Sequence, residues 1–161
     1  MRRLAVNPAP CTGCLCCQSV CAQNRTGDQD RRASAFQVEL DLFGGLHSHV
    51  YCRQCHPAQC AAACSSGAIT RNGIEESWTV DPDTCTRCGT CVDACPFGAM
   101  GWHPVDGPVK CDLCGGEPLC ASACMFGVIR FLDVSDSEFG FNGMPPGEQD
   151  PTLGRGSVGG S

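Results

Sequence analysis

Cysteine is the residue that most constrains what this chain can fold into. Seventeen of its 161 residues are cysteines, and sixteen of these fall into four groups of four. The first and third groups have the spacing C-x2-C-x2-C-x3-C, and the second and fourth widen the middle gap to four and five residues. The groups are Cys11, Cys14, Cys17 and Cys21; Cys52, Cys55, Cys60 and Cys64; Cys85, Cys88, Cys91 and Cys95; and Cys111, Cys114, Cys120 and Cys124. So many cysteines in a small chain indicate a disulfide scaffold or a metal protein.

The spacing within the groups favours 4Fe-4S clusters. Three cysteines at C-x2-C-x2-C surround a body larger than a single ion, and a fourth thiolate from elsewhere completes the four iron corners of a cubane. In two-cluster ferredoxins the last cysteine of C-x2-C-x2-C-x3-C-P ligates the other cluster, so that such groups work in pairs. The third group has this whole pattern, including Pro96. Four complete groups therefore predict four 4Fe-4S clusters.

Other cysteine chemistries explain the pattern less well. Structural zinc usually combines two separated C-x2-C pairs, which leaves the third and fourth cysteines of each group unexplained. Residues 1–10 contain no apolar segment typical of a secretory signal, so we expect thiols in a reducing cytoplasm rather than disulfides. No group has the C-x3-C-x2-C order of radical S-adenosylmethionine enzymes. No apolar stretch is long enough to span a bilayer, so we expect no direct membrane contact.

One cysteine is left over, and a few other side chains lie near the groups. Using Cys16 in place of Cys17 would give a spacing unlike the other groups, so we predict that Cys16 is not a ligand and packs as a small apolar residue. Lys110 precedes Cys111 and is either solvated or a cation that raises a cluster's potential. Because cysteine already fills sixteen ligand positions, no histidine is expected to be a ligand; these are His47, His49, His56 and His103.

The cysteine groups are embedded in a repeated local pattern. After three groups a glycine is followed by apolar residues, at 66–69, 97–100 and 126–129, which predicts a turn and a short strand. Positions i and i+4 share one face of a helix, so a single helical turn is expected between the last two cysteines of each group. Residues 78–80 predict another short strand, closed by the turn-forming Asp81-Pro82.

Two further segments differ from this repeat. Residues 36–42 alternate apolar and polar side chains, which predicts a half-buried strand that ends at Gly44-Gly45. Residues 133–161 are rich in glycine, proline, serine and acidic side chains, which is typical of an irregular tail. Within that tail Phe139, Phe141 and Met144 could lie against a partner.

Charge and missing motifs limit the function. The formal net charge is −6, and clusters with their thiolates would make it more negative, which disfavours binding to nucleic acid or anionic lipid. The sequence has no glycine-rich nucleotide-binding fingerprint and no convergent acid-base pair. We therefore expect a non-catalytic electron carrier.

Several segments carry a resemblance to a known family: residues 11–14, 52–55, 88–99 and 110–120. Over about residues 4–132 the chain resembles the four-cluster ferredoxin-like subunits of molybdenum and tungsten oxidoreductases, hydrogenases and carbon monoxide dehydrogenases. The iron-sulfur subunit of the dimethyl sulfoxide reductase type is the best-known branch. The short length and the run Cys-Asp-Leu-Cys-Gly-Gly-Glu-Pro at 111–118 are similar to small subunits that accompany tungsten-containing aldehyde oxidoreductases.

The resemblance implies an α+β fold of two bacterial-ferredoxin-like, βαβ-type modules, one nested within the other. The first and fourth groups would form the first module, residues 1–21 with 104–132, and the second and third groups the second module, residues 51–103. Residues 22–50 would be an insertion with a strand or hairpin, and residues 133–161 a glycine- and proline-rich tail. Proline follows the last cysteine only in the third group, and Ala22, Ser65 and Met125 stand in the other three places.

The resemblance also implies how the ligands are shared, which spacing alone leaves open. The first set is Cys11, Cys14, Cys17 and Cys124; the second is Cys21, Cys111, Cys114 and Cys120; the third is Cys52, Cys55, Cys60 and Cys95; the fourth is Cys64, Cys85, Cys88 and Cys91. These four sets are numbered in this order below.

The function implied is an electron relay. Its partner would be the catalytic subunit of a molybdenum- or tungsten-pterin oxidoreductase, with aldehyde oxidation as the first choice. A flavin or NAD subunit could accompany that partner. The alternatives are a relay subunit of a hydrogenase or carbon monoxide dehydrogenase, a free soluble polyferredoxin, and a zinc-dependent interaction protein.

Overall fold

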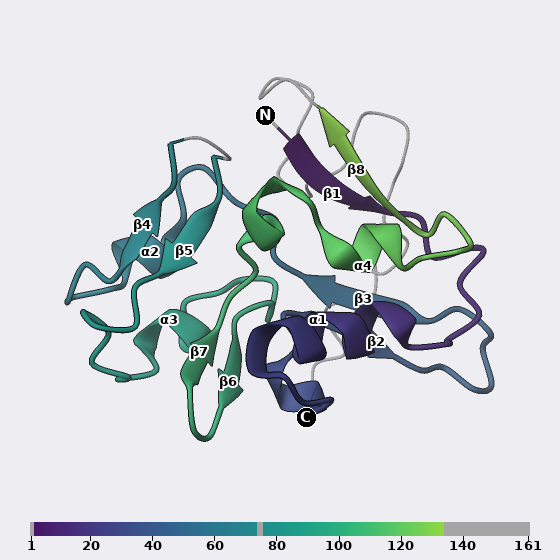
Figure 1. Cartoon of the computed structure of the whole chain (residues 1–161), viewed down its shortest axis with the longest axis horizontal. Coiled ribbons are helices and arrows are strands. Elements are labelled where there is room, and N and C mark those ends of the chain that lie inside the picture. Colours follow the sequence, from purple (N-terminus) through teal and green to yellow (C-terminus); the bar gives the residue numbers. More distant parts are fainter. Residues whose placement is uncertain (1, 74–75, 134–161) are drawn as a thin grey trace, which may run out of the picture.

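A computed structural model describes residues 2–73 and 76–133 (Figure 1). This part of the chain is a small α+β structure in which short strands pair into four two-stranded antiparallel sheets. The strands are β1 (Arg2–Val6), β2 (Phe36–Glu39), β3 (Ser48–Tyr51), β4 (Ile69–Arg71), β5 (Trp78–Val80), β6 (Gly101–His103), β7 (Gly107–Val109) and β8 (Ile129–Asp133). The helices are α1 (Cys16–Thr26), α2 (Gln59–Ala62), α3 (Thr90–Asp93) and α4 (Leu119–Ser122), with 3-10 turns η1 (Arg31–Ala33) and η2 (Leu113–Gly116).

Strands β1 and β8 join the two ends of the described chain. They pair antiparallel from Arg2 opposite Asp133 to Val6 opposite Ile129, and lie side by side in Figure 1. Burial of the apolar residues on this pair stabilises it. The pairing brings the segment before the first cysteine group next to the segment after the fourth.

Strands β2 and β3 form a hairpin against the same part of the molecule. Phe36 lies opposite Tyr51, and the two rings stack with centroids 5.5 Å apart and an interplanar angle of 20°. Both residues are buried, as is Val38 two positions along β2. The apolar side of the alternating segment therefore does face the interior at these positions.

The predicted strand over residues 36–42 is too long. Strand β2 ends at Glu39 because its partner β3 begins opposite, at Ser48. The chain then turns around Asp41, whose carboxylate accepts hydrogen bonds from the backbone N–H groups of residues 43 and 44. Leu40 and Leu42 consequently lie beyond the sheet and are exposed.

The helical turns lie where the cysteine spacing predicts them. Helices α2, α3 and α4 are single turns between the last two cysteines of the second, third and fourth groups. Helix α1 is longer, at 11 residues, and is capped by Gly27, which has a φ of 74° and donates its N–H to the Gln23 carbonyl. It packs against α4 and η1. The buried Gln18 of α1 also accepts a hydrogen bond from the Val38 N–H of β2.

The strands that follow the glycine turns are confirmed. Strand β4 begins at Ile69 and β8 at Ile129, inside the predicted segments, and β5 covers the predicted residues 78–80. After the third group the strand is displaced, because β6 begins at Gly101, beyond the predicted residues 97–100. Strand β7, which pairs with β6, was not predicted, because its Gly107-Pro108 is a turn signal rather than a strand signal. The predicted tail lies outside the described residues except for Asp133.

Apolar side chains gather in two places of unequal size. The larger core lies between β1–β8, the β2–β3 hairpin and η2, and consists of Leu4, Val6, Phe36, Val38, Tyr51, Leu113, Cys120, Val128 and Ile129. The smaller one lies between β4–β5 and α3, and consists of Ile69, Cys91 and Met100. Cysteines pack against both, so the walls of both cores are partly sulfur.

Candidate iron-sulfur sites

The first ligand set lines a cavity beside the larger core. All four of its cysteines face this cavity, and its other walls include the apolar side chains of Val38, Val128 and Ile129. Cysteines 11, 14 and 17 come from the loop before α1 and its first turn, and Cys124 follows α4. The β1–β8 pair and the α1–α4 contact therefore bring these distant segments to one site.

The fourth ligand set lines a second cavity in the same way. Cys64 comes from the end of the second group, and the other three cysteines come from the loop before α3 and its first turn. Ile69 of β4 and Val80 of β5 form part of the apolar wall. Each of these two cavities thus holds one complete set of four cysteines.

Several thiols of the predicted second and third sets lie near one another. Burial raises the pKa of Cys55, and the neighbours that raise it further are Cys52, Cys95 and Cys60. Burial raises the pKa of Cys120 to about 12, and Cys21 and Cys114 add to the rise. The members of each set therefore lie close enough to repel one another as thiolates.

The surroundings of these thiols suit a cluster better than a disulfide or free thiolates. All seventeen cysteines are free thiols in the structure. Burial also raises the pKa of Cys17 to about 12 and that of Cys111 well above its usual value, so bare thiolates there would be unfavourable. A positively charged iron-sulfur core would stabilise them. Among the residues that the structure describes, no three or more possible ligands converge closely enough for a single metal ion.

Backbone and side-chain donors point at several of the sulfurs. The N–H of Ala35 donates to the Cys21 sulfur over 3.3 Å, and the N–H of Gln54 donates to the Cys52 sulfur over 3.5 Å. Hydrogen bonds to cluster sulfurs are one of the ways in which a protein sets cluster potentials.

Two of the sixteen predicted ligands are exposed: Cys14 of the first set and Cys88 of the fourth. The backbone N–H of residue 16 is the main cause of a lowered pKa at Cys14. At Cys88 the pKa is also lowered, mainly by the Thr90 hydroxyl, which lies 3.4 Å from the sulfur. The first and fourth sets therefore each have an edge at the protein surface.

The environment predicted for Cys16 is wrong. Its thiol is exposed rather than packed, because the residue begins helix α1 on the solvent side. The thiol lies 3.9 Å from the Cys14 carbonyl oxygen, and the neighbouring Cys14 raises its pKa. Cys16 is also among the residues that line the cavity of the first set.

Lys110 is buried, so the first of its two predicted roles, a solvated side chain, is wrong. Its side chain is 4% exposed, and its Nζ lies 3.0 Å from the Cys52 sulfur. Burial alone would lower the pKa of Lys110, but the thiols of Cys52, Cys60 and Cys111 raise it overall. The ammonium form is therefore favoured beside these sulfurs.

Sequence reasoning missed Gln54, which lies inside the second group. Its Nε2 donates to the Cys111 carbonyl over 2.8 Å, and its Oε1 accepts from the Trp78 N–H over 2.9 Å. The Trp78 indole in turn donates to the Cys55 carbonyl. Gln54 therefore ties the second group to the fourth, a role for which the sequence offers no signal beyond its place between two cysteines.

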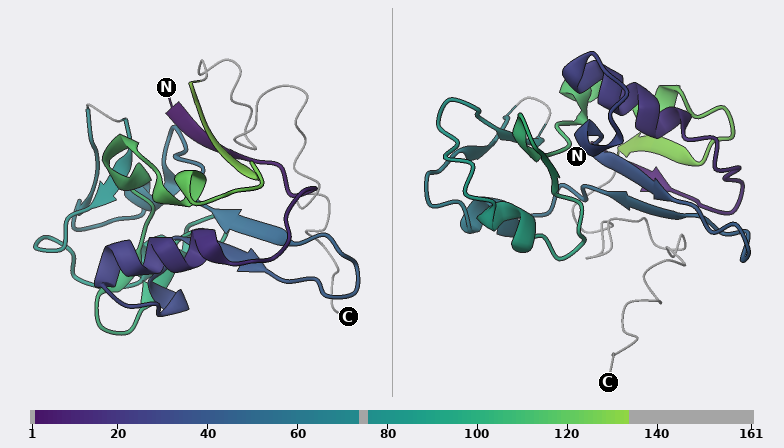
Figure 2. Two further views of the ribbon diagram at one scale, coloured as in Figure 1. Left: turned by 45° about the vertical axis from the view of Figure 1, so that its right-hand side comes forward. Right: turned by 90° about the horizontal axis from the view of Figure 1, so that it is seen from below.

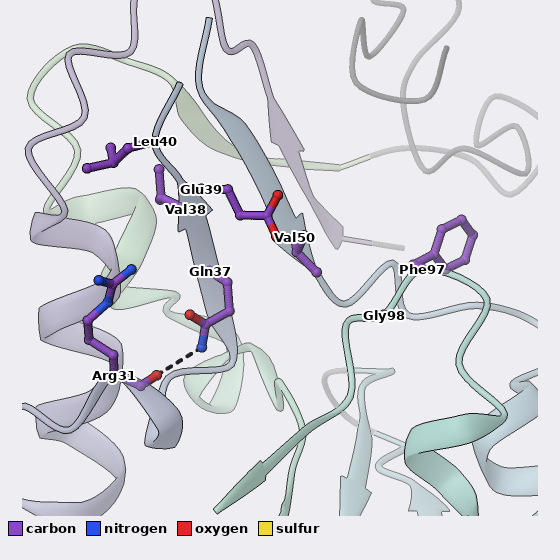
Figure 3. A pocket seen from close by; sticks show the side chains of 8 residues that line it. All are labelled: Arg31, Gln37, Val38, Glu39, Leu40, Val50, Phe97 and Gly98. Carbon is purple, nitrogen blue, oxygen red and sulfur yellow. Dashed lines mark hydrogen bonds between the residues drawn. The ribbon is translucent and has the colours of Figure 1, made fainter. Parts of the chain in front are cut away.

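A further hollow lies between the β2–β3 hairpin and the turn at Phe97 (Figure 3). Gln37 spans part of it and donates to the Arg31 carbonyl. The one carboxylate that lines the hollow, that of Glu39, accepts a hydrogen bond from the Ser48 hydroxyl. No cysteine lines this hollow, and its described lining residues offer no pair of acid and base, so it is not a candidate cluster or catalytic site.

None of the described helices combines the length and the apolar character needed to cross a membrane.

Comparison with known proteins places the chain among iron-sulfur proteins. Residues 51–99 match the family model of the 4Fe-4S dicluster domain. The polyferredoxin-like subunit of an aliphatic sulfonate oxidoreductase from Pyrococcus furiosus is 33% identical over 123 residues, which cover 75% of this chain and 70% of that subunit. The electron transport protein HydN of Escherichia coli is 31% identical over 150 residues, covering 76% of this chain and 83% of HydN.

A longer relative and one solved structure add to these matches. The β subunit of NADH-dependent phenylglyoxylate dehydrogenase from Aromatoleum evansii is 31% identical over 136 residues, 83% of this chain, and this chain spans 30% of its length. The active-site complex BamBC of benzoyl-coenzyme A reductase with 1,5-dienoyl-CoA contains a chain with a TM-score of 0.50 at 21% identity, covering 84% of this chain and 79% of that one. This structural likeness shows a shared fold.

The cysteine-lined sites and the dicluster match define a ferredoxin-like, 4Fe-4S electron-transfer protein. Within that class, the chain belongs to the family of iron-sulfur electron-transport proteins and polyferredoxin-like subunits that includes HydN and the Pyrococcus subunit.

Proposed function

We propose that this chain is a non-catalytic subunit that relays electrons through four 4Fe-4S clusters between a catalytic oxidoreductase subunit and an acceptor. The observation that carries the proposal is the pair of cavities, each lined by all four cysteines of one predicted ligand set. The other two sets are supported by the neighbours of two of their thiols: Cys52, Cys95 and Cys60 raise the pKa of Cys55, and Cys21 and Cys114 raise that of Cys120.

The proposed ligand sets are the four implied by the family pattern. The first and second would belong to one ferredoxin-like module, and the third and fourth to a module inserted within it. The pairing of β1 with β8 supports the first module, because it joins the segments that carry the first and fourth groups. The pairing of β4 with β5 supports the second, because these strands connect the second and third groups. Cys16 would not be a ligand.

The proposed order of clusters along the relay follows from which sets are neighbours. Cys17 of the first set raises the pKa of Cys120 in the second, and Cys52 of the third raises that of Cys111 in the second. Cys60 of the third set raises the pKa of Cys91 in the fourth. The sets thus run from first to fourth, with the exposed Cys14 and Cys88 at the two ends. When bound, the clusters would supply one-electron redox chemistry; the chain's own residues hold, space and insulate them.

For the partner we propose a molybdenum- or tungsten-pterin oxidoreductase subunit, with aldehyde oxidation as the first choice. The resemblance of residues 111–118 to small subunits of tungsten enzymes favours it, and two relatives are named as subunits of a dehydrogenase and an oxidoreductase. Exposed apolar side chains beside the first site, at Met125 and Phe126, favour a stable contact. A hydrogenase or carbon monoxide dehydrogenase is the alternative partner.

A free soluble polyferredoxin is the second candidate function. It is favoured by relatives that are named simply as electron transport proteins, HydN and YsaA. Anaerobic purification from native expression separates the two. A stable hetero-oligomer containing molybdenum or tungsten supports the subunit, and a monomer that exchanges electrons with several enzymes supports the free carrier.

The ligand sets are tested by two cysteine variants. Cys21→Ala should damage the second cluster and spare the first, although Cys21 belongs to the first group in sequence. The matched control Cys16→Ala should retain all clusters. Electron paramagnetic resonance and iron analysis report the outcome: loss of a cluster in Cys16→Ala, or loss of the first cluster in Cys21→Ala, contradicts the assignment.

A further inference from the structure

Lys110 is the single lysine of the sequence, and the fold buries it. It directly follows strand β7 and precedes Cys111. Its backbone carbonyl accepts a hydrogen bond from Arg25 of helix α1 over 2.9 Å, and its Nζ lies 3.0 Å from the Cys52 sulfur. Both the backbone and the side chain of Lys110 are therefore held in place.

The residue lies where two cluster sites meet. Cys52 belongs to the proposed third set and Cys111 to the second. Gln54, two residues after Cys52, donates to the Cys111 carbonyl over 2.8 Å, which fixes the spacing between these two segments. An electron that passes along the whole relay has to cross this junction.

A buried cation at this junction has a definite electrostatic consequence. Lysine carries a compact positive charge with three donors, and one of them is within hydrogen-bonding reach of a ligand sulfur. Reduction adds one negative charge to a cluster, and a nearby positive charge stabilises the reduced form more than the oxidised form. Net charge and hydrogen bonds to sulfur are among the factors that set cluster potentials.

We propose that Lys110 raises the reduction potential of the third cluster, for which Cys52 is a proposed ligand. Electron transfer to the third cluster is then more favourable than it would be without this charge. This inference rests on the proposed relay, because it assumes clusters in the second and third sets.

The test compares two substitutions of similar size. Lys110→Met removes the charge and keeps much of the apolar stem, and Lys110→Arg keeps the charge. Arg71→Met is the control for charge alone, because Arg71 forms an ion pair with Glu76 on the β4–β5 hairpin. Redox titration followed by electron paramagnetic resonance, on the full chain with its iron content determined, gives the potentials.

The expected result is a shift of one cluster to lower potential in Lys110→Met, with Lys110→Arg and Arg71→Met close to the unmodified chain. Full iron content and unchanged potentials in Lys110→Met would overturn the proposal for Lys110 and leave the relay intact. A chain that never takes up iron would instead overturn the relay itself.

A second measurement on the unmodified chain applies if Lys110→Met does not fold. Labelling with 15N-lysine gives one lysine side-chain signal, since the sequence has a single lysine. If the Nζ lies beside a ligand sulfur, this signal should be broadened or shifted by the paramagnetic cluster and should change on reduction. An ordinary solvent-exposed signal that reduction leaves unchanged would overturn the proposal.

Discussion

Two regions of the molecule use different means of holding their cysteines. The terminal region, residues 2–51 and 110–133, contains the larger apolar core, and the central region, residues 52–109, contains the smaller one. The two lie side by side in the right-hand view of Figure 2. In the terminal region Phe36, Val38 and Tyr51 of the β2–β3 hairpin add the apolar side chains. Segment 22–50 therefore adds to the core of the terminal region, and we expect the central region to depend more on bound clusters.

The largest effect is expected from removing the clusters. After iron chelation the central region should lose nearly all protection of its amide hydrogens, because metal-binding energy is folding energy in a region with so small a core. The terminal region should keep partial protection in β1, β2, β3 and β8. Hydrogen exchange with mass spectrometry measures both regions in one sample. Equal amide protection in the two regions after chelation would contradict the expectation that the central region depends more on its clusters.

The second-largest effect is expected from a substitution in the larger core. Phe36→Ala removes a buried ring that stacks on Tyr51, and such truncations cost about 3–5 kcal/mol of unfolding free energy. Anaerobic urea denaturation should show the loss as a lower midpoint. The control is Phe43→Ala in the same hairpin, which is fully exposed and should cost less than about 0.5 kcal/mol. Similar midpoints for the two variants would show that the buried side chains of the hairpin do not stabilise the terminal region.

The connection between the regions should be weakened by Gln54→Leu. This change leaves the Cys111 carbonyl and the Trp78 N–H without their partner, at a cost of about 1–3 kcal/mol. Amide protection should fall on both sides of the junction. Gln59→Leu, at an exposed position in α2, is the matched control and should be neutral. An equal effect of the two would mean that Gln54 does not join the regions.

The smallest effect concerns the turn before the third cysteine group. The Thr84 hydroxyl, with the Asp83 N–H, lowers the pKa of Asp81 below its usual 3.8. Its contribution to stability is then fully present above the unfolded pKa and is lost only as pH falls below it. Asp81→Asn should therefore lower the unfolding midpoint by the same small amount at about pH 8 and at about pH 5. Asp83→Asn is the control; a deficit that shrinks between these pH values would contradict the account.

Much of the central region could be predicted from local sequence. The spacing of the last two cysteines in a group predicts the single-turn helices α2 and α3, and glycine followed by apolar residues predicts β4. The same glycine signal predicts β8 in the terminal region. These features depend on residues close together in the chain. The dicluster match over residues 51–99 falls on the same region.

Features that depend on distant segments could not be predicted. The alternation of residues 36–42 does not reveal that the partner strand begins at Ser48, which leaves Leu40 and Leu42 outside the sheet. Lys110 is buried only because the segment around Cys52 lies against it, 58 residues away in sequence. Cys16 is exposed because helix α1 begins there, a boundary that spacing does not set.

The direct test of the central claim is the iron and acid-labile sulfide content of the anaerobically prepared full chain, reconstituted to saturation. Four 4Fe-4S clusters predict about 16 iron atoms and about 16 sulfides per chain. A reproducible content of about eight iron atoms and about eight sulfides would mean two clusters. It would contradict the proposal that each of the four cysteine sets holds a cluster.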